Sequence, residues 1–303
     1  MSLSVTILGV SSAVPTSSRF TTSQVVNCNH HLYLIDCGEG TQIQLRKYKQ
    51  KFSDINHIFI SHLHGDHFYG LFGLLSSFNL FGRKQDLHIY SFPALQSIIE
   101  SIFGFSKEKQ LYKIVWHFLT NDRPRIILDD KRLTVESVPL VHRVECCAFV
   151  FREKEKPLNI NKESIAEYSL SISQIVKAKN GEDIVLDNGT TILNHLLTHA
   201  PLPPESYAFV TDTLYLPEVA GHLKNIGLLY HEATFLESET EEATATKHCT
   251  APQAAKFAQI CQPKKLILGH FSSRYQDLEE HLLQAKSIFP NTVLGNEGET
   301  YTV

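Results

Sequence analysis

The chain has 303 residues, 43% of them apolar, with 28 Lys and Arg against 32 Asp and Glu residues, for a formal net charge of −4. The apolar content is enough for a large core, which excludes a disordered protein, and the acidic balance excludes a generally basic, nucleic-acid-coating surface, so any contact with RNA must be local. The six cysteines form no CxxC pair, residues 1–10 carry no Lys or Arg, and no apolar run approaches about 18 residues, so we expect a soluble, unprocessed cytoplasmic protein with reduced thiols and no membrane contact.

Short runs of β-branched and aliphatic residues predict strands along the whole chain. In chain order they are residues 4–8, 32–35, 58–60, 87–90, 133–139, 147–151, 206–211, 226–231 and 265–269. Helices are predicted at residues 68–82, where nearly every side is apolar, and at 94–103, 251–260 and 278–288. This order favours an α/β protein with two sheets flanked by helices. We expect a single domain over residues 1–303, with a polar insertion at residues 151–183.

The densest group of candidate metal ligands directly follows a predicted strand. It is the segment Ser61-His62-Leu63-His64-Gly65-Asp66-His67, with three imidazoles and a carboxylate in six residues. Such density is hard to explain as packing, although a solvated His-rich turn is the alternative. Imidazole and carboxylate suit Zn²⁺ or Mn²⁺, and a tight loop lets alternate side chains face two ions.

Two metal ions need more ligands than this segment holds, and candidates stand at the ends of other predicted strands. His142 follows strand 133–139, Asp212 follows strand 206–211, and His270 follows strand 265–269. A strand-end histidine by itself is usually an ordinary core or surface residue. The joint placement of these three residues nevertheless favours a shared metal site.

The HxHxDH segment followed by strand-end His, Asp and His in that order resembles the metallo-β-lactamase superfamily over essentially the whole chain. The resemblance implies a four-layer αββα sandwich and two divalent metal ions, expected to be Zn²⁺. One ion would be held by His62, His64 and His142 and the other by Asp66, His67 and His270, with Asp212 as the bridge.

Other segments resemble the ribonuclease Z family of this superfamily, which removes the 3′ trailer from precursor tRNA. They are the DCGEGTQ run at 36–42, the HEAT run at 231–234, the HCTA run at 248–251 and the HFSSRY run at 270–275. Two positions depart from the family pattern, since Cys249 stands where the family usually has Ser and Ala13 where it often has Gly.

Two metal ions about 3.5–4 Å apart can hold a hydroxide for in-line attack on phosphorus, which leaves a 3′-hydroxyl on the tRNA. Asp66 is the expected acceptor of the nucleophile's proton. Glu232 holding His248 in its cationic form is the expected proton donor to the departing oxygen, a role that the pair has in the family. Ordinary loop or capping roles are the alternatives for Glu232 and His248. Asp36 is expected to orient a ligand histidine rather than to bind metal.

Phosphate contacts are expected at two places. Ser272 and Arg274 follow the last predicted ligand, and Arg46, Lys47 and Lys49 form a local basic run, with an ordinary loop and a solvated helix face as the alternatives. Family members clamp tRNA with an inserted arm and act as homodimers, so the resemblance implies precursor tRNA and a second copy of the chain as partners. Residues 151–183 lack the Gly-Pro tip that the family's arm usually bears.

Two alternative functions stay open. One is another phosphodiesterase or an arylsulfatase-like hydrolase on the same scaffold. The other is a nucleic-acid-binding protein that keeps the fold without turnover.

Overall fold

The computed structural model describes residues 3–106 and 111–303, so residues 1–2 and 107–110 of the predicted 1–303 domain lie outside the described residues. The chain divides into two compact units. The first combines Met1–Glu153 with Glu205–Val303, and the second is Lys154–Pro204. The second unit is inserted into the sequence of the first.

The first unit is built on two seven-stranded mixed sheets. One sheet has the order β18-β1-β2-β3-β4-β5-β6 and consists of β18 (Thr300–Thr302), β1 (Leu3–Gly9), β2 (Ser23–Cys28), β3 (His31–Ile35), β4 (Ile55–Phe59), β5 (Leu87–Ser91) and β6 (Ile114–Phe118). The other has the order β17-β16-β15-β14-β9-β8-β7 and consists of β17 (Thr292–Leu294), β16 (Lys265–Gly269), β15 (Leu228–Glu232), β14 (Ser206–Val210), β9 (Glu145–Glu153), β8 (Leu133–Val141) and β7 (Arg125–Asp129). Strands β3 to β6 run parallel, as do β14 to β17.

The two sheets pack face to face through aromatic side chains. The ring of Phe59 on β4 lies 5.5 Å from that of Phe149 and 5.4 Å from that of Phe151, both on β9, measured between centroids. All three side chains are fully buried. Burial of rings this large is a major source of fold stability, and it fixes the two sheets at one spacing.

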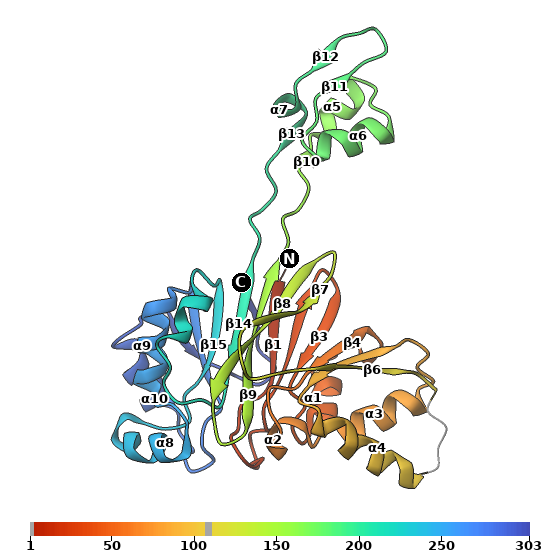
Figure 1. Ribbon diagram of the computed structural model, residues 1–303. Helices are drawn as coiled ribbons and strands as arrows, with labels where there is room; N and C mark the ends of the chain where they lie inside the picture. The colour runs from red at the N-terminus through yellow and green to blue at the C-terminus, as the bar shows by residue number, and fades with distance from the viewer. Residues whose placement is uncertain (1–2, 107–110) are drawn as a thin grey trace. The chain divides into compact units, whose positions relative to one another are not determined.

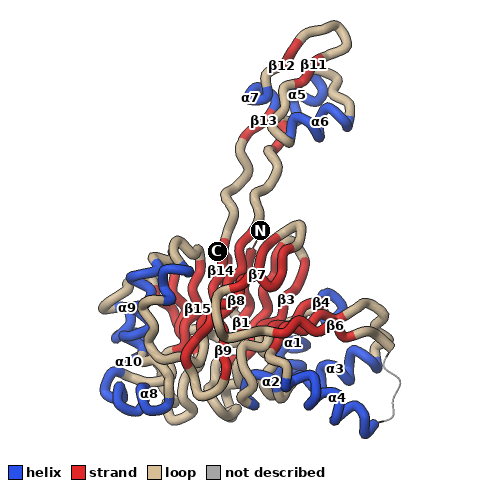
Figure 2. Tube along the Cα trace, viewed as in Figure 1, coloured by secondary structure: helices blue, strands red, loops and turns tan. Residues whose placement is uncertain are grey.

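Helices cover the outer faces of both sheets (Figures 1 and 2). On the first sheet lie α1 (Thr41–Lys47), α3 (Leu71–Leu80) and α4 (Ala94–Ser106), and with the second sheet lie α9 (Ala251–Cys261) and α10 (Glu279–Lys286). Two further helices, α2 (Gly65–Phe68) and α8 (Thr240–Thr246), lie beside the loops described below. The αββα architecture predicted from the sequence is therefore confirmed.

The helix predicted at residues 68–82 is wrong at its start. The chain instead forms α2, interrupts it at Tyr69 and Gly70, and begins α3 at Leu71. A Cβ atom at Gly70 would overlap the carbonyl oxygen of Gly38, so glycine permits this close approach between the helix start and the loop after β3.

The inserted unit has secondary structure and a small core of its own. Two short ladders pair β10 (Asn159–Ile160) with β13 (Thr198–His199) and β11 (Ile184–Val185) with β12 (Thr191–Ile192), and the helices are α5 (Lys162–Glu167), α6 (Ile172–Lys179) and α7 (Asn194–Leu197). The core contains Leu170, Ala178, Ile184, Ile192 and Leu197. The insertion predicted at 151–183 has different bounds, because residues 151–153 still pair within β9 and the chain returns to β10 only at β13.

Across the described parts of the chain, no helix combines the length and apolar character needed to cross a membrane.

Candidate metal and catalytic site

The site lies where the carboxyl ends of strands from both sheets meet. The loop after β4 carries His62, and the chain reaches Asp212 after β14 and His270 after β16. Asp212 and His270, as well as Asp36 after β3, have left-handed backbones, with φ values of 31°, 55° and 53°. This conformation costs a non-glycine residue on the order of 1–3 kcal/mol, so surrounding contacts must hold these three residues in place.

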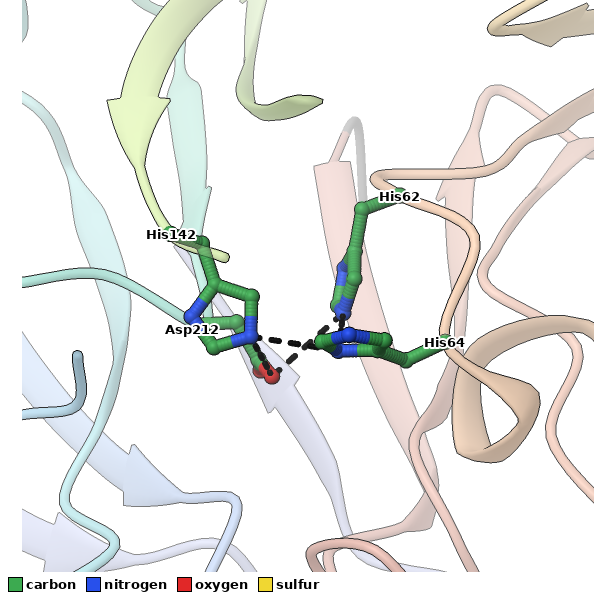
Figure 3. A group of neighbouring side chains, drawn as sticks. All are labelled: His62, His64, His142 and Asp212. Carbon is green, nitrogen blue, oxygen red and sulfur yellow. Dashed lines mark hydrogen bonds and ion pairs between the residues drawn. The ribbon is translucent and has the colours of Figure 1, made fainter. Parts of the chain in front are cut away.

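Four side chains form the first cluster, drawn in Figure 3. The Nδ1 atom of His64 lies 3.1 Å from Nε2 of His62 and 3.1 Å from Nε2 of His142. Oδ2 of Asp212 lies 3.4 Å from Nε2 of His62 and 3.6 Å from Nε2 of His142. Three imidazole nitrogens and one carboxylate oxygen therefore converge on one point.

The second cluster contains Asp66, His67 and His270. Oδ2 of Asp66 lies 3.3 Å from Nε2 of His67 and 3.5 Å from Nε2 of His270. Oδ1 of Asp212 lies 3.4 Å from Nε2 of His67 and 3.0 Å from Nε2 of His270. The two oxygens of Asp212 thus face different clusters, which is the placement that a bridging carboxylate requires.

Hydrogen bonds on the far side of the imidazole rings fix their orientation. His67 donates from Nδ1 to Oδ2 of Asp36 at 2.7 Å, the contact expected of an orienting aspartate, and His142 donates from Nδ1 to the backbone oxygen of Lys247 at 3.0 Å. His270 Nδ1 lies 3.0 Å from the hydroxyl of Thr234. When Nδ1 carries the proton of a neutral ring, Nε2 presents a lone pair, and in all three rings Nε2 faces the clusters.

The residues of both clusters have the chemistry of divalent-metal ligands. His67 Nε2 and His270 Nε2 are buried and have no hydrogen-bond partner among residues 3–106 and 111–303, although such atoms are normally satisfied. Imidazole nitrogen and carboxylate oxygen are common ligands of Zn²⁺ and of other divalent metals. All seven residues predicted as ligands, His62, His64, Asp66, His67, His142, Asp212 and His270, are brought together.

Glu232 and His248 form a hydrogen-bonded pair beside the clusters. Glu232 ends β15, is fully buried, and has Oε1 3.1 Å from Nδ1 of His248. Burial alone lowers the pKa of His248, but the charge of Glu232 and its hydrogen bond outweigh burial, so this pKa lies above the usual histidine value. The contact with Glu232 therefore favours the cationic form of His248.

The clusters open into a cleft of about 660 Å³. Its lining includes His64, Asp66, His142 and His248 together with Ser272 and Arg274. The predicted phosphate contacts Arg46, Lys47 and Lys49 are not part of this lining. Arg46 and Lys49 line a separate hollow of about 380 Å³, where the guanidinium of Arg46 lies 5.4 Å from the ring centroid of Phe52.

Three residues of the site were not predicted. The backbone N–H of Ala13 donates to Oδ2 of Asp66 at 2.8 Å, the hydroxyl of Thr234 donates to Oε2 of Glu232 at 2.6 Å, and Lys247 contacts His142. Thr234 belongs to the HEAT run at 231–234, so that motif could have indicated it as a site residue. Ala13 acts through its backbone N–H, and Lys247 acts through its ammonium and its backbone oxygen. Their partners are distant in the sequence, so no local motif indicates these contacts.

Comparison with known proteins places the chain among hydrolases. A family model for the anti-Pycsar protein Apyc1 matches residues 3–102. Ribonuclease Z of Bacteroides thetaiotaomicron is 45% identical over 98% of this chain and 94% of its own length, and ribonuclease Z of Cytophaga hutchinsonii is 41% identical over 100% of this chain and 97% of its own.

Solved structures of similar fold include a tRNase Z and a metallo-beta-lactamase fold protein. The short form of human tRNase Z has a TM-score of 0.72 and 25% identity, covering 99% of this chain and 98% of that one. The metallo-beta-lactamase fold protein YhfI of Bacillus subtilis has a TM-score of 0.69 and 17% identity, covering 99% and 98%. Fold and site together define a hydrolase of the metallo-β-lactamase fold. Within that class, the identity to the curated relatives over nearly the whole chain shows that the protein belongs to the ribonuclease Z family, the metal-dependent tRNA 3′ endonucleases of this fold.

Proposed function

We propose that this protein is a zinc-dependent endoribonuclease that removes the 3′ trailer from precursor tRNA and leaves a 3′-hydroxyl on the tRNA. The observation that carries the proposal is the position of Asp212 between the two clusters, beside the Glu232 and His248 pair. Asp212 and the two clusters would hold two ions, and the Glu232 and His248 pair would supply a proton donor. Cleavage of a phosphodiester with a poor leaving group needs both.

His62, His64 and His142 would hold one zinc ion and Asp66, His67 and His270 the other, with Asp212 shared. A pair of bound ions supplies an activated water and stabilises charge on the phosphate. The remaining steps belong to the side chains of the chain itself.

Proton transfer is assigned to two residues that line the cleft. Asp66 accepts the proton of the attacking water, and the hydrogen bond from the backbone N–H of Ala13 fixes its Oδ2 atom. His248 gives a proton to the departing 3′-oxygen. Because Nδ1 of His248 is bonded to Glu232, Nε2 is the nitrogen that donates it.

We propose further that the inserted unit, Lys154–Pro204, is the arm that binds tRNA, and that the protein acts as a homodimer in the cytoplasm. The position of the unit between β9 and β14 supports the first assignment, because the family resemblance implies an arm inserted in this part of the chain. Ser272 would contact a phosphate at the mouth of the cleft, where it forms part of the lining.

The test is incubation of the protein with a 3′-extended tRNA, followed by mapping of the cut and of the end groups. We expect cleavage at the base of the trailer, a 3′-hydroxyl on the tRNA and a 5′-phosphate on the trailer. A chromogenic phosphodiester serves as the comparison substrate. Hydrolysis of the small substrate without cleavage of the tRNA would instead assign the site to a small-molecule phosphodiesterase.

A further inference from the structure

Helix α8 leads directly to His248, and two groups of contacts fasten it to the metal site. We name residues 239–248 the α8 segment. We propose that Arg274 and Lys247 are positioning residues that hold the α8 segment, and with it His248, against the metal ligands. The proposal rests on the proton-donor role of His248 in the proposed function, and it assigns to Arg274 a role different from the phosphate binding expected from the sequence.

Arg274 fastens the start of the α8 segment. Its Nη1 atom lies 2.6 Å from Oε1 of Glu239 and its Nη2 atom 2.7 Å from Oε1 of Glu242, while Nη1 also donates to Oε2 of Glu242 at 3.2 Å. The guanidinium lies 5.1 Å from the ring centroid of Phe235. Since Arg274 stands four residues after His270, these contacts join the α8 segment to the loop of a predicted metal ligand.

Lys247 fastens the end of the segment to a different ligand. Its ammonium donates to the backbone oxygen of His142 at 2.9 Å, and its own backbone oxygen accepts from Nδ1 of His142 at 3.0 Å. The backbone of Lys247 is left-handed, with φ of 61°. This turn ends α8 and directs the chain toward His248.

The contacts of Arg274 argue against phosphate binding. An arginine binds phosphate best through the two-pronged edge of its guanidinium, and in Arg274 that edge already holds Glu242. A substrate phosphate at the same edge would lie beside the carboxylates of Glu239 and Glu242 and would be repelled by both. The pairing neutralises Arg274 and leaves it as a structural fastening.

The consequence for catalysis is geometric. The backbone N–H of His248 donates to the oxygen of Ala243 at 2.8 Å, which ties the backbone of His248 to α8. A displacement of about 1 Å of a catalytic group can cost roughly 10²-fold in rate. Removing the contacts of Arg274 or of Lys247 should therefore slow the step that needs the proton of His248.

The experiment compares Arg274→Ala with the double variant Glu239→Gln/Glu242→Gln, using Glu241→Gln as the matched control. Glu241 is an exposed carboxylate on the same helix and is adjacent to Glu242. We expect kcat on precursor tRNA to fall by roughly 10–100-fold in Arg274→Ala and in the double variant, with little change in KM, while Glu241→Gln matches the parent. On a nitrophenyl phosphodiester, whose leaving group needs no proton, both variants should retain most of their activity.

The proposal would be overturned if Arg274→Ala and Glu239→Gln/Glu242→Gln changed KM for precursor tRNA in opposite directions. If Arg274 binds phosphate, removing its competing carboxylates should lower KM for precursor tRNA and steepen its salt dependence, whereas Arg274→Ala should raise KM. Lys247→Met provides an independent variant of the second fastening, and it should reproduce the kcat loss on tRNA with the metal content unchanged. Parent-like kcat in Lys247→Met would contradict its positioning role.

Hydrogen exchange separates failure of this proposal from failure of the proton-donor assignment. Amides 243–248 should exchange faster in Arg274→Ala and in Lys247→Met, whatever the chemical role of His248. If His248→Ala slows both substrates equally while these amides still loosen, the proton-donor role is wrong and the fastening stands. Unchanged exchange in both variants would overturn the fastening itself.

Discussion

Replacing His248 with alanine should separate cleavage of precursor tRNA from cleavage of an activated phosphodiester. In the proposed mechanism, the ring of His248 donates the proton, and Glu232 only holds that ring. A ribose 3′-oxygen is a poor leaving group and needs that proton, whereas a nitrophenolate leaves without one. We expect the variant to lose most of its activity on tRNA and to keep most of its activity on the nitrophenyl substrate.

The size of the loss follows from the single proton transfer removed. General acid catalysis contributes roughly 10²–10⁴-fold, which corresponds to about 3–5 kcal/mol of transition-state stabilisation. The structure indicates that the fold survives the change. Without His248, Glu232 still accepts hydrogen bonds from the N–H of Thr213 at 2.7 Å, the N–H of Cys249 at 3.1 Å and the hydroxyl of Thr234 at 2.6 Å.

The assay is single-turnover cleavage of a 3′-extended tRNA in parallel with steady-state hydrolysis of the nitrophenyl substrate, with metal content measured on the same samples. Glu232→Gln should show the same split, because the neutral amide does not favour the cationic ring of His248. His222→Ala, which removes an exposed histidine outside the site, is the control. Equal slowing of both substrates with metals retained would refute the reasoning and would indicate that His248 stabilises charge on the phosphoryl oxygens.

Three further predictions concern metal, substrate and stability. Asp212→Ala should lower the metal content at both clusters, and two retained ions by elemental analysis would contradict the bridge. Replacing Lys154–Pro204 with a short turn should weaken precursor tRNA binding in a filter or gel assay but spare the small substrate, and equal loss on both would make this unit part of the core. Burial and the neighbouring His88 lower the pKa of His57 to about 4, so its folded state favours the neutral ring, and the stability it contributes above pH 6.5 is lost as the pH falls toward 4. The free energy of unfolding should therefore fall between pH 7 and pH 5 by about 2 kcal/mol less in His57→Phe than in the parent, as measured by urea titration at both pH values. An identical fall in both proteins would exclude His57 as a source of the pH dependence of stability.

The ligand positions could be predicted because their chemistry is local. Few packing arrangements need three histidines and an aspartate in six residues, and a polar residue directly after a buried strand, such as Asp212 or His270, is visible from the apolar run before it. The central strands were found for the same reason. Their residues are buried on both faces, so the apolar run is continuous.

The parts that could not be predicted depend on tertiary partners. Strands β6 and β7 were not predicted, although each contains three consecutive apolar residues, at 114–116 and 126–128. Strand β7 is mostly exposed and β6 is only half-buried, and pairing with β8 and β5 places them in the sheets. The far end of the inserted unit is set by pairing of β10 with β13, nearly forty residues later in the chain. The contacts of Arg274 with Glu239 and Glu242 could not be predicted either, because these partners lie more than thirty residues before it in the sequence.

The attachment of the inserted unit has a consequence for how such enzymes diversify. The unit leaves β9 and returns to β14, two strands that are adjacent and antiparallel, and the N–H of Glu153 donates to the oxygen of Glu205 at 2.9 Å across its base. A segment whose two ends are already side by side can be lengthened, shortened or exchanged for a foreign domain at small entropic cost to the sandwich. Inserted units can therefore be exchanged at this junction, by natural recombination or by design, without a change in the residues of the metal clusters.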